Sequence, residues 1–578
     1  MQTEDKVLTG YPSIDKPWLR YYSEEAINRE LPKCSIYEYM RERNINNLTD
    51  IALEYFGRKI IYKELFDNIE KTAKAFTALG VKRGDIVVVI TITTPETIYM
   101  LYALNLLGAI PNMVDPRTST DGIREYIKEV NAKYVVVIEP AYPKMEKAVE
   151  GTNVDKIVVV SPADSLTGIK KWVYQVTNRS GKLSNISMRW NKFIQDGLKA
   201  TIEFDRYSEK RCCVIVHTGG TTGLPKGVML SDDNFNAAAQ QAFDSPILMS
   251  KQDKFLNIMP PFIAYGMVLG IHTAISSGWH SIIIPKFTVE EFDKLLIKYR
   301  PAGIMGIPTY FEKLMESSLL SKADLSFLKV VLVGGDRTSA EFENKVNTFF
   351  GAHGCTMHLS KGYSMTEASS TATISFENAN KVGSNGIPLC KTVVSTFDME
   401  TAAELTYGEE GELCIQTPTM MLGYYGKQAE TEFILKEHAD GTVWIHTGDV
   451  GTVDEDGFIN VSGRAKRIII RYDAWKVFPT HIENVVLQHD FVENCCVVGM
   501  EDKQHMQGKL PVVFVVCNQK YEGDNEYLAS EIMALCGDQL PEYAQPVDIR
   551  FVESLPLTSI GKIDYRALES LLEETNTN

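Results

Sequence analysis

The sequence lacks an excess of positive charge, a disulfide pattern and a zinc-binding motif. Across 578 residues the formal net charge is −16, which disfavours nucleic acid as the main partner because a phosphate backbone requires a basic surface. Ten cysteines in so long a chain give no disulfide framework. The pairs Cys212-Cys213 and Cys495-Cys496 lie inside apolar runs and are typical of reduced core residues. No CxxC or His/Cys spacing indicates zinc.

The sequence also has no apolar leader and no clear membrane-spanning segment. Residues 1–6 contain no hydrophobic stretch, so we expect no secretory signal and a cytoplasmic location. Residues 255–285 contain no Lys, Arg, Asp or Glu, and a run of that length could cross a bilayer. However, Pro260-Pro261, Gly266 and Gly270 interrupt the run, and no basic cluster marks an orientation. We therefore expect a buried strand, turn and helix here, and no transmembrane segment.

The composition is that of a globular protein, 44% hydrophobic and 23% charged, and the length suggests several domains. Short β-branched runs at 87–92, 134–139 and 156–160 alternate with segments of helical periodicity, and the periodicity of residues 51–84 predicts helix. This alternation predicts an α/β fold with a parallel sheet and crossover helices. Residues 482–568 alternate short strands with helices, which predicts a smaller α+β domain.

An apolar strand at residues 212–216 runs into a loop suited to polyphosphate. Glycines let backbone N–H groups converge on one point, threonine hydroxyls add donors, and a lysine adds a full positive charge. The residues predicted to bind ATP phosphates here are Thr218, Gly219, Gly220, Thr221, Thr222, Gly223 and Lys226. The loop is not the common P-loop, because no Ser or Thr follows Lys226 to hold magnesium.

Two glycine turns further along the chain end in acidic residues. The strand at 330–333 runs into Gly335 and Asp336, a shape suited to nucleotide contact at the carboxyl edge of a sheet. In His446–Asp449 the carboxylate of Asp449 is suited to hold both hydroxyls of a ribose.

The hexapeptide Gly362–Glu367 supplies three further groups. Tyr363 offers a ring face on which adenine can stack. Thr366 offers a hydroxyl for phosphate, and Glu367 offers the oxygen ligand that magnesium prefers. The hexapeptide alone is a weak signal, but it gains weight from the phosphate loop that precedes it.

Together these segments resemble the motifs of the adenylate-forming, or AMP-binding, enzyme superfamily, which includes acyl-CoA synthetases, luciferases and peptide-synthetase adenylation domains. The resemblance extends from Tyr62 to Leu568, with six motifs in the family's order, and is closest in character to the acyl-CoA synthetases. It implies a large N-terminal α/β domain with several subdomains and a small mobile α+β C-terminal domain. We assign these to residues 1–463 and 464–578.

The resemblance also implies roles for residues near the domain boundary and the C-terminus. Gly463–Lys466 is similar to the family's hinge, in which Arg464 would contact phosphate and ribose and Lys466 would carry the rotation. Leu555–Leu568 is similar to the last family motif, so Lys562 is expected to be catalytic together with Thr366 and Lys226.

The segment Asn257–Met267 resembles the one that lines the acyl pocket in relatives. It lacks the aspartate that grips the ammonium group in amino-acid-activating relatives, and Ser364 stands where acetate-activating relatives have a tryptophan. These differences favour a fatty, aryl or other bulky apolar acid. The predicted acyl pocket comprises Phe262, Ile263, Ala264, Tyr265, Gly266, Gly334 and Ser364.

The resemblance implies a two-step ligase that uses ATP, Mg²⁺ and a thiol. A carboxylic acid and ATP first give an acyl-adenylate and pyrophosphate, and the thiol then takes the acyl group. Free coenzyme A is the favoured thiol, and a separate carrier protein is the alternative.

Two alternatives from other classes remain open at this point. A P-loop-like NTPase would release phosphate instead of pyrophosphate. A catalytically inactive nucleotide-binding protein is conceivable because Gly219, Ile263 and Ala474 replace the Ser or Thr, the His and the Gly that relatives usually carry.

Residues 165–200 form a segment of different character before the phosphate loop. The segment contains seven basic residues and a single acidic residue, Asp196. The aromatic residues Trp172, Tyr174, Trp190 and Phe193 are interleaved with them. In an acidic chain this composition is compatible with a membrane-surface or partner-docking patch. A solvated insertion is the favoured interpretation.

Overall fold

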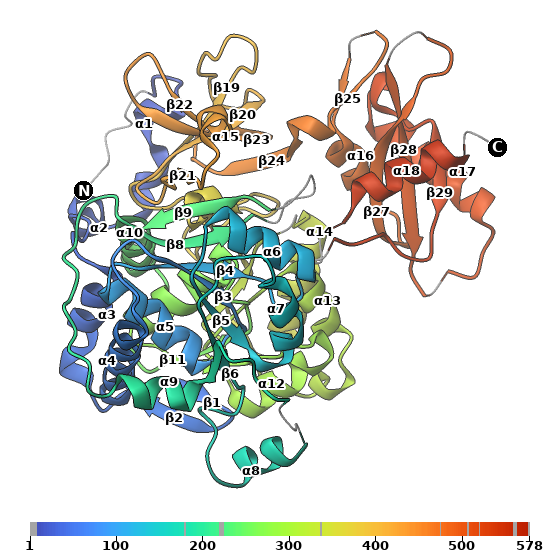
Figure 1. Cartoon of the computed structure of the whole chain (residues 1–578). Coiled ribbons are helices and arrows are strands. Elements are labelled where there is room, and N and C mark those ends of the chain that lie inside the picture. Colours follow the sequence, from blue (N-terminus) through green and yellow to red (C-terminus); the bar gives the residue numbers. More distant parts are fainter. Residues whose placement is uncertain are drawn as a thin grey trace.

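The computed structural model describes residues 8–177, 181–218, 225–335, 338–473, 475–505, 508–519, 521–558 and 563–575. A large body carries a smaller C-terminal unit to one side, and strand β24 (Ile459–Arg464) leads from one to the other (Figure 1). The large body and the small unit are the two domains that the sequence predicts.

An eight-stranded sheet forms one centre of the large body. Its strands from β3 to β8 run parallel, because helices of the crossover type return the chain to the same edge each time. The order across the sheet is β21 (Gly423–Tyr424), β9 (Gly227–Ser231), β8 (Cys212–His217), β4 (Ile110–Val114), β3 (Ile86–Ile90), β5 (Tyr134–Ile138), β6 (Lys156–Val160) and β7 (Ser187–Arg189). β9 turns back antiparallel to β8, so the phosphate loop lies at the tip of a hairpin.

A seven-stranded sheet forms the second centre. It is parallel except at the edge pair β1–β2. The order is β14 (Ser360–Lys361), β13 (Val330–Val333), β12 (Gly303–Gly306), β10 (Lys254–Asn257), β11 (His280–Ile283), β1 (Ile51–Tyr55) and β2 (Arg58–Ile61).

Helices cover these sheets with their apolar faces. Leu65, Ile69, Ala73 and Phe76 of α4 are buried, as their three- and four-residue spacing predicts. The helices that pack on the two sheets include α3 (Ile36–Asn44), α4 (Tyr62–Leu79), α5 (Pro95–Leu106), α6 (Thr120–Glu129), α7 (Tyr142–Ala148), α9 (Trp190–Gly197), α10 (Asp232–Asp244), α12 (Phe292–Tyr299), α13 (Pro308–Met315) and α14 (Ala340–Ala352).

The prediction of helix from residue 51 is wrong for its first eleven residues. Ile51–Tyr55 and Arg58–Ile61 are strands of a tight hairpin, with Phe56 and Gly57 both at positive φ in its turn. Strand β1 gains a parallel partner, β11, that is more than two hundred residues away in sequence. Such long-range pairing decides the structure of a short apolar run.

The apolar run at residues 255–285 is buried in the protein, as predicted. It begins in β10, continues in the π-helix η4 (Tyr265–Thr273) and the short α11 (Ala274–Ser276), and ends in β11. Among the described residues, no helix is both long enough and apolar enough to cross a membrane.

A five-stranded antiparallel sheet caps the large body and leads toward the C-terminal domain. It consists of β19 (Val393–Phe397), β20 (Gly411–Gln416), β22 (Leu435–Glu437), β23 (Val443–Val453) and β24. β15 (Ser364–Met365) and β16 (Ser370–Thr371) form a small separate ribbon.

The C-terminal domain has its own hydrophobic core. β27 (Val492–Glu501), β28 (Lys509–Cys517) and β29 (Asp548–Phe551) form its sheet, and α16 (Pro479–Val486), α17 (Asn525–Gln539) and α18 (Tyr565–Thr575) pack around it. Ile482, Val497, Val513 and Leu528 lie in the core on one face of this sheet.

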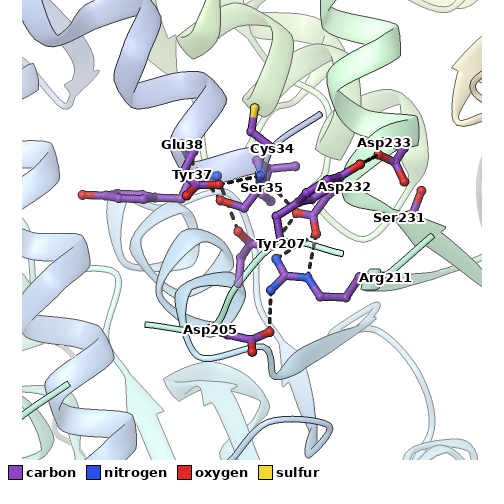
Figure 2. A network of polar contacts seen from close by, with 12 residues as sticks. Cys34, Ser35, Tyr37, Glu38, Asp205, Tyr207, Arg211, Ser231, Asp232 and Asp233 are labelled. Carbon is purple, nitrogen blue, oxygen red and sulfur yellow. Dashed lines mark hydrogen bonds and ion pairs between the residues drawn. The ribbon is translucent and has the colours of Figure 1, made fainter. Parts of the chain in front are cut away.

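A buried polar network fixes the base of the β8–β9 hairpin (Figure 2). Arg211, one residue before β8, donates to Asp232 at the start of α10 and to Asp205, each at 2.7 Å. Asp232 also accepts from the Asn105 side chain at 2.6 Å and from the Ile36 amide at 2.9 Å. The network therefore ties together α3, α5, α10 and the entry to the phosphate loop.

Candidate active site

The two ends of the phosphate loop are held together at the tip of the β8–β9 hairpin. The Thr218 amide donates to the Lys226 carbonyl, and the Lys226 amide donates to Thr218 Oγ1, both at 3.1 Å. Gly219, Gly220, Thr221, Thr222 and Gly223 lie outside the described residues. The loop therefore leaves and re-enters the sheet at one point.

Tyr424 connects the loop lysine with the predicted metal ligand. Lys226 Nζ lies 4.5 Å from the centroid of the Tyr424 ring, a cation–π contact. The Tyr424 hydroxyl donates to Glu367 Oε1 at 2.6 Å. Burial first, and the Glu367 charge second, raise the pKa of Tyr424 above its usual value, so the phenol stays protonated and remains a donor.

Sequence reasoning missed Tyr424. The segment Leu422–Tyr425 has the composition of a loop, whereas the structure adds Gly423–Tyr424 to the eight-stranded sheet as β21. The amide of Met421 also donates to the carbonyl of Glu367 at 2.8 Å. Only the two aromatic residues after a glycine could have indicated a site residue here.

Asp449 lies between Tyr363 and Arg464. The Tyr363 hydroxyl donates to Asp449 Oδ2, and Arg464 Nε lies 2.6 Å from Asp449 Oδ1. Asp449 and Arg464 are direct partners in the β23–β24 pair. Burial, followed by the nearby Asp449 charge, raises the pKa of Tyr363 well above its usual value. The structure thus brings together the three residues predicted to contact adenosine.

Glu412 and His446 fix the turn that carries Asp449. Glu412 on β20 accepts from the Gly448 amide at 2.9 Å through Oε1, and Oε2 lies 2.8 Å from His446 Nδ1. Gly448 has φ +67°, a conformation that favours glycine. The Asp449 amide donates to Thr447 Oγ1 at 3.0 Å. Sequence reasoning assigned no role to Glu412, because its partners come from a different strand.

His446 is itself held from a second side. Its Nε2 lies 3.0 Å from Nε2 of His438, and Cys414 Sγ lies 3.6 Å from its Nδ1. With a proton on Nδ1 directed to Glu412, His446 Nε2 accepts from His438. The turn before Asp449 is therefore braced by a chain of polar contacts.

The predicted acyl-pocket residues fall into two groups. Tyr265 lies against the turn after β13, because a Cβ on Gly334 would be 3.8 Å from the Tyr265 hydroxyl oxygen. Gly266 instead has a packing role, since a Cβ there would meet the Pro260 carbonyl oxygen at 1.9 Å. Phe262 and Ala264 are buried, and Ile263 is half-buried. Ser364 begins β15, and Gly335 has φ +83° just before Asp336, which is outside the described residues.

An apolar cavity adjoins this region. It is narrow, with a volume of about 70 Å³. Leu269 lines it, one helical turn beyond Tyr265. Leu332 on β13 lines it too, two residues before Gly334. Other lining residues are Val268, Ile304, Met305, Ser370, Thr371 and Ile374. The cavity is mostly hydrophobic and lies between η4 and the seven-stranded sheet.

The predicted hinge lies between two anchored arginines. Arg464 is held to Asp449 of the large body. Arg467 donates to Glu483 of the C-terminal domain at 2.7 Å and lies 5.4 Å from the Tyr565 ring centroid. The backbone of Lys466 forms the short turn η8 (Ala465–Arg467) between these anchors. Lys562 and Ala474 are outside the described residues.

The described residues predicted to bind the nucleotide and the metal ion form two contact chains. Lys226, Glu367 and Tyr424 form one contact chain, while Tyr363, Asp449 and Arg464 form the other. Thr366 begins the turn η7 (Thr366–Ala368), between Tyr363 and the ribbon strand β16. A cation, an aromatic ring and two carboxylates are groups suited to phosphate, adenine, a metal ion and ribose, respectively.

Comparisons with known proteins agree with this arrangement. The AMP-binding enzyme family matches residues 41–425, and the AMP-binding enzyme C-terminal domain matches residues 481–562. The chain is 28% identical over 575 residues to a long-chain-fatty-acid–CoA ligase of Bacillus subtilis (strain 168), covering 97% of this chain and 99% of that protein. It is 29% identical over 505 residues to a Dictyostelium discoideum protein named "Probable 4-coumarate--CoA ligase 1", covering 86% of this chain and 87% of that protein.

The fold is also similar to that of a solved ligase structure. The anthranilate CoA ligase AuaEII in complex with anthranoyl-AMP matches with a TM-score of 0.81 and 20% identity, over 95% of this chain and 99% of that chain. The family match covers more than half of the sequence, and its two parts correspond to the large and small domains of the structure. The chain belongs to the AMP-binding enzyme family.

Proposed function

We propose that this protein is an AMP-forming acid–thiol ligase of the acyl-CoA synthetase type. It joins a carboxylic acid to ATP, releases pyrophosphate, and then transfers the acyl group from AMP to the thiol of coenzyme A. The observation that carries the proposal is a pair of neighbouring contact chains. Tyr424 links Lys226 with Glu367, Asp449 links Tyr363 with Arg464, and Glu367 and Arg464 lie close enough for their charges to interact. The relatives named as CoA ligases, and the similar fold solved with an acyl-adenylate, support the same reaction.

The chemistry of the first step is mainly electrostatic. The carboxylate of the acid substrate is already ionised at neutral pH, so its attack on the α-phosphorus needs no general base. Charge instead accumulates on the leaving pyrophosphate, and groups fixed in advance stabilise it best. In this proposal Lys226, Thr366, the loop hydroxyls and Lys562 supply these groups, and Asp449 and Arg464 hold the ribose.

Glu367 is the residue proposed to hold Mg²⁺. Its carboxylate offers the hard oxygen ligand that the ion prefers. The Tyr424 hydroxyl donates to Oε1, and the same tyrosine ring contacts Lys226, so the carboxylate lies near the lysine that we propose to bind phosphate. When bound, the ion would add positive charge beside the phosphate oxygens.

The acid substrate is proposed to be apolar and of several carbons. The segment from Phe262 to Gly266 carries no charged side chain. Leu269 and Leu332 line a narrow hydrophobic cavity and lie four residues after Tyr265 and two residues before Gly334, so an apolar tail that passes these residues would meet hydrophobic side chains. Coenzyme A is the proposed thiol, a carrier protein is the alternative, and the proposed location is the cytoplasm. The residue ranges 1–463 and 464–578 remain the proposed domains.

Acid-dependent exchange of labelled pyrophosphate into ATP tests this function. We expect fatty and aryl acids to support faster exchange than acetate or free amino acids, and we expect coenzyme A to convert the products into acyl-CoA. A preference for acetate or an amino acid would reject the apolar pocket. Release of phosphate without any acid-dependent exchange would favour an NTPase, and no exchange with any acid would favour an inactive nucleotide-binding protein.

A further inference from the structure

Helix α8 (Gly168–Thr177) presents large apolar side chains to solvent. Figure 1 shows it at the lower edge of the molecule, projecting away from the sheets and far from the C-terminal domain. The exposed fractions are 79% for Ile169, 64% for Trp172, 44% for Val173 and 55% for Val176. Exposed apolar side chains this large and this close together are unusual on a soluble surface and mark an interaction site.

These four residues form one stripe on the helix. Their positions, i, i+3, i+4 and i+7, fall on the same face of an α-helix. The other side of α8 faces the protein. Burial raises the pKa of Tyr174, which packs against the core of the large body, and Lys171 Nζ donates to the Asp164 carbonyl at 3.4 Å. The helix is therefore attached by one face while the apolar stripe points outward.

A second exposed aromatic side chain lies at the base of the same helix. Lys170 Nζ donates to the carbonyl of Phe56 at 2.6 Å. Phe56 is 46% exposed in the tight turn between β1 and β2. The hairpin turn and the first turn of α8 are thus held side by side, which extends the apolar surface beyond the helix.

The segment that carries the stripe is basic in sequence although the whole chain is acidic. Residues 165–200 contain seven Lys or Arg and one acid, Asp196, in a chain of net charge −16. Asp196 is paired with Lys192 at 2.8 Å, and Arg189 is paired with Glu139 at 2.9 Å. The positive charge closest to the stripe is therefore that of Lys170 and Lys171, which lie on α8 itself. No acidic residue occurs in the sequence between Ser165 and Asp196. An apolar stripe flanked by basic residues is complementary to an anionic lipid bilayer, which has an apolar interior and negatively charged headgroups.

We propose that α8 is an interfacial helix that docks this enzyme on an anionic lipid bilayer. Ile169, Trp172, Val173 and Val176 enter the boundary between headgroups and acyl chains, and the exposed Lys170 in the first turn of the helix supplies positive charge for the phosphates. Tryptophan is favoured at this depth because its ring is apolar and its N–H is polar. Docking of this kind needs no membrane-spanning helix. The proposal concerns a surface remote from the nucleotide site and does not depend on the identity of the acid substrate.

Vesicle binding tests the proposal directly. The full-length protein is mixed with vesicles of equal parts phosphatidylglycerol and phosphatidylcholine, or of phosphatidylcholine alone, and the bound fraction is measured by co-sedimentation at low and high salt. We expect binding to the anionic vesicles, and a loss of at least tenfold with neutral vesicles or in high salt. Absence of binding to the anionic vesicles, or equal binding to both compositions, would overturn the proposal and would leave the stripe for a protein partner.

A matched pair of substitutions locates the binding surface. Trp172→Glu is compared with Tyr527→Glu, because Tyr527 on α17 is also a helical aromatic residue and is 63% exposed. We expect Trp172→Glu to weaken vesicle binding at least tenfold and Tyr527→Glu to change it less than twofold. Equal effects of the two substitutions would overturn the assignment to α8.

Fluorescence gives a readout that does not depend on a disruptive substitution. Brominated lipids quench tryptophans that enter the bilayer, and the chain has six tryptophans. We expect Trp172→Phe to keep vesicle binding within about threefold and to lose most of the quenching. Undiminished quenching in Trp172→Phe would mean that another part of the surface enters the membrane, which contradicts the proposal.

Discussion

Asp449 is a buried carboxylate whose two oxygens are both engaged before any nucleotide binds. Tyr363 donates to one oxygen and Arg464 lies 2.6 Å from the other. Only 4% of the residue is exposed. The position of a carboxylate so enclosed depends on the backbone that carries it. That backbone follows a turn at Gly448, and the Gly448 amide donates to Glu412. The residue that orients the proposed ribose ligand is therefore a glutamate on the neighbouring strand.

Glu412→Gln tests this positioning role. Burial alone opposes ionisation of Glu412, but hydrogen bonds from His446 and the Gly448 amide hold its pKa below the usual value. Removing the charge weakens both bonds, and a hydrogen bond to a charged group contributes about 1.5–3 kcal/mol. We expect the KM for ATP to rise roughly tenfold to a hundredfold, with a smaller change in kcat. Glu437→Gln on the exposed face of β22 is the control. An unchanged KM for ATP would remove Glu412 from the site.

Glu96 gives a prediction for the pH dependence of stability. This residue in α5 is 2% exposed, and burial raises the pKa of its carboxyl from 4.5 to about 7. The folded state thus binds the proton more tightly than the unfolded state does. The stabilisation is fully present below pH 4.5 and is lost as the pH rises through about 7, a change of about 3 kcal/mol.

Glu96→Gln removes this titration and keeps an acceptor for the Ser165 hydroxyl, which donates to Glu96 Oε1 at 2.5 Å. We expect the variant to gain stability relative to the wild type as the pH rises from 5 to 8, as measured by urea unfolding at each pH. A difference between the two proteins that does not change with pH would contradict an elevated carboxyl pKa.

At the scale of elements, the β8–β9 hairpin depends on charges that lie behind it. The side chain of Arg211 is 9% exposed, and that of its partner Asp232 is fully buried. A buried ion pair is costly to break, because the remaining charge loses both its partner and its solvent, at about 3–5 kcal/mol. The strand that leads into the phosphate loop is thus anchored from below by ionic contacts.

Arg211→Met should therefore lower the free energy of unfolding by about 3–5 kcal/mol. The adjacent Lys210→Met is the control, since Lys210 is an exposed cation of similar length and should change stability by less than about 0.5 kcal/mol. Chemical unfolding monitored by circular dichroism measures both. A similar small loss in the two variants would show that the network contributes little to stability.

The sequence predicted those elements whose structure is set by local pattern. The β-branched runs at 87–92, 134–139 and 156–160 became parallel strands, and the spacing of Leu65 and Ile69 marked the buried face of α4. Residues 51–61 were missed because β1 is defined by its distant partner β11. The helical spacing of the residues after 61 gives no sign that residues 51–55 pair with a distant strand.

The site, too, was predicted only where a local motif reveals the role of a residue. Residues with chemistry in their own motif, such as Tyr363, Asp449 and Arg464, are brought together as expected. Tyr424 and Glu412 act through contacts from other strands, and neither stands in a motif that states its role. The basic segment 165–200 was interpreted as a solvated insertion, whereas the outward apolar stripe of α8 appears only once the helix is placed against the body.

At the scale of the whole molecule, a short backbone segment joins the two domains, and within the part of the chain that the structure describes two weak ion pairs also connect them. The ion pair of Lys476 with Glu400 spans 3.7 Å, and that of His481 with Glu410 spans 3.8 Å. All four side chains are substantially exposed, and such pairs contribute about 0–1 kcal/mol each. These two ion pairs therefore contribute little to holding the C-terminal domain in this orientation.

Lys466→Pro tests whether that backbone must change conformation between the two half-reactions. Proline fixes φ near −65°, so a residue that rotates can no longer reach its second state. We expect one half-reaction to fall by roughly a hundredfold while the other is retained, the scale of losing a correctly positioned group. The adenylation step is measured by pyrophosphate exchange, and the thioester step by acyl-CoA formation from a preformed acyl-adenylate. Lys466→Ala, which leaves the backbone free, should retain both steps; equal loss of both in Lys466→Pro with an unchanged Tm would show that no rotation at this residue separates them.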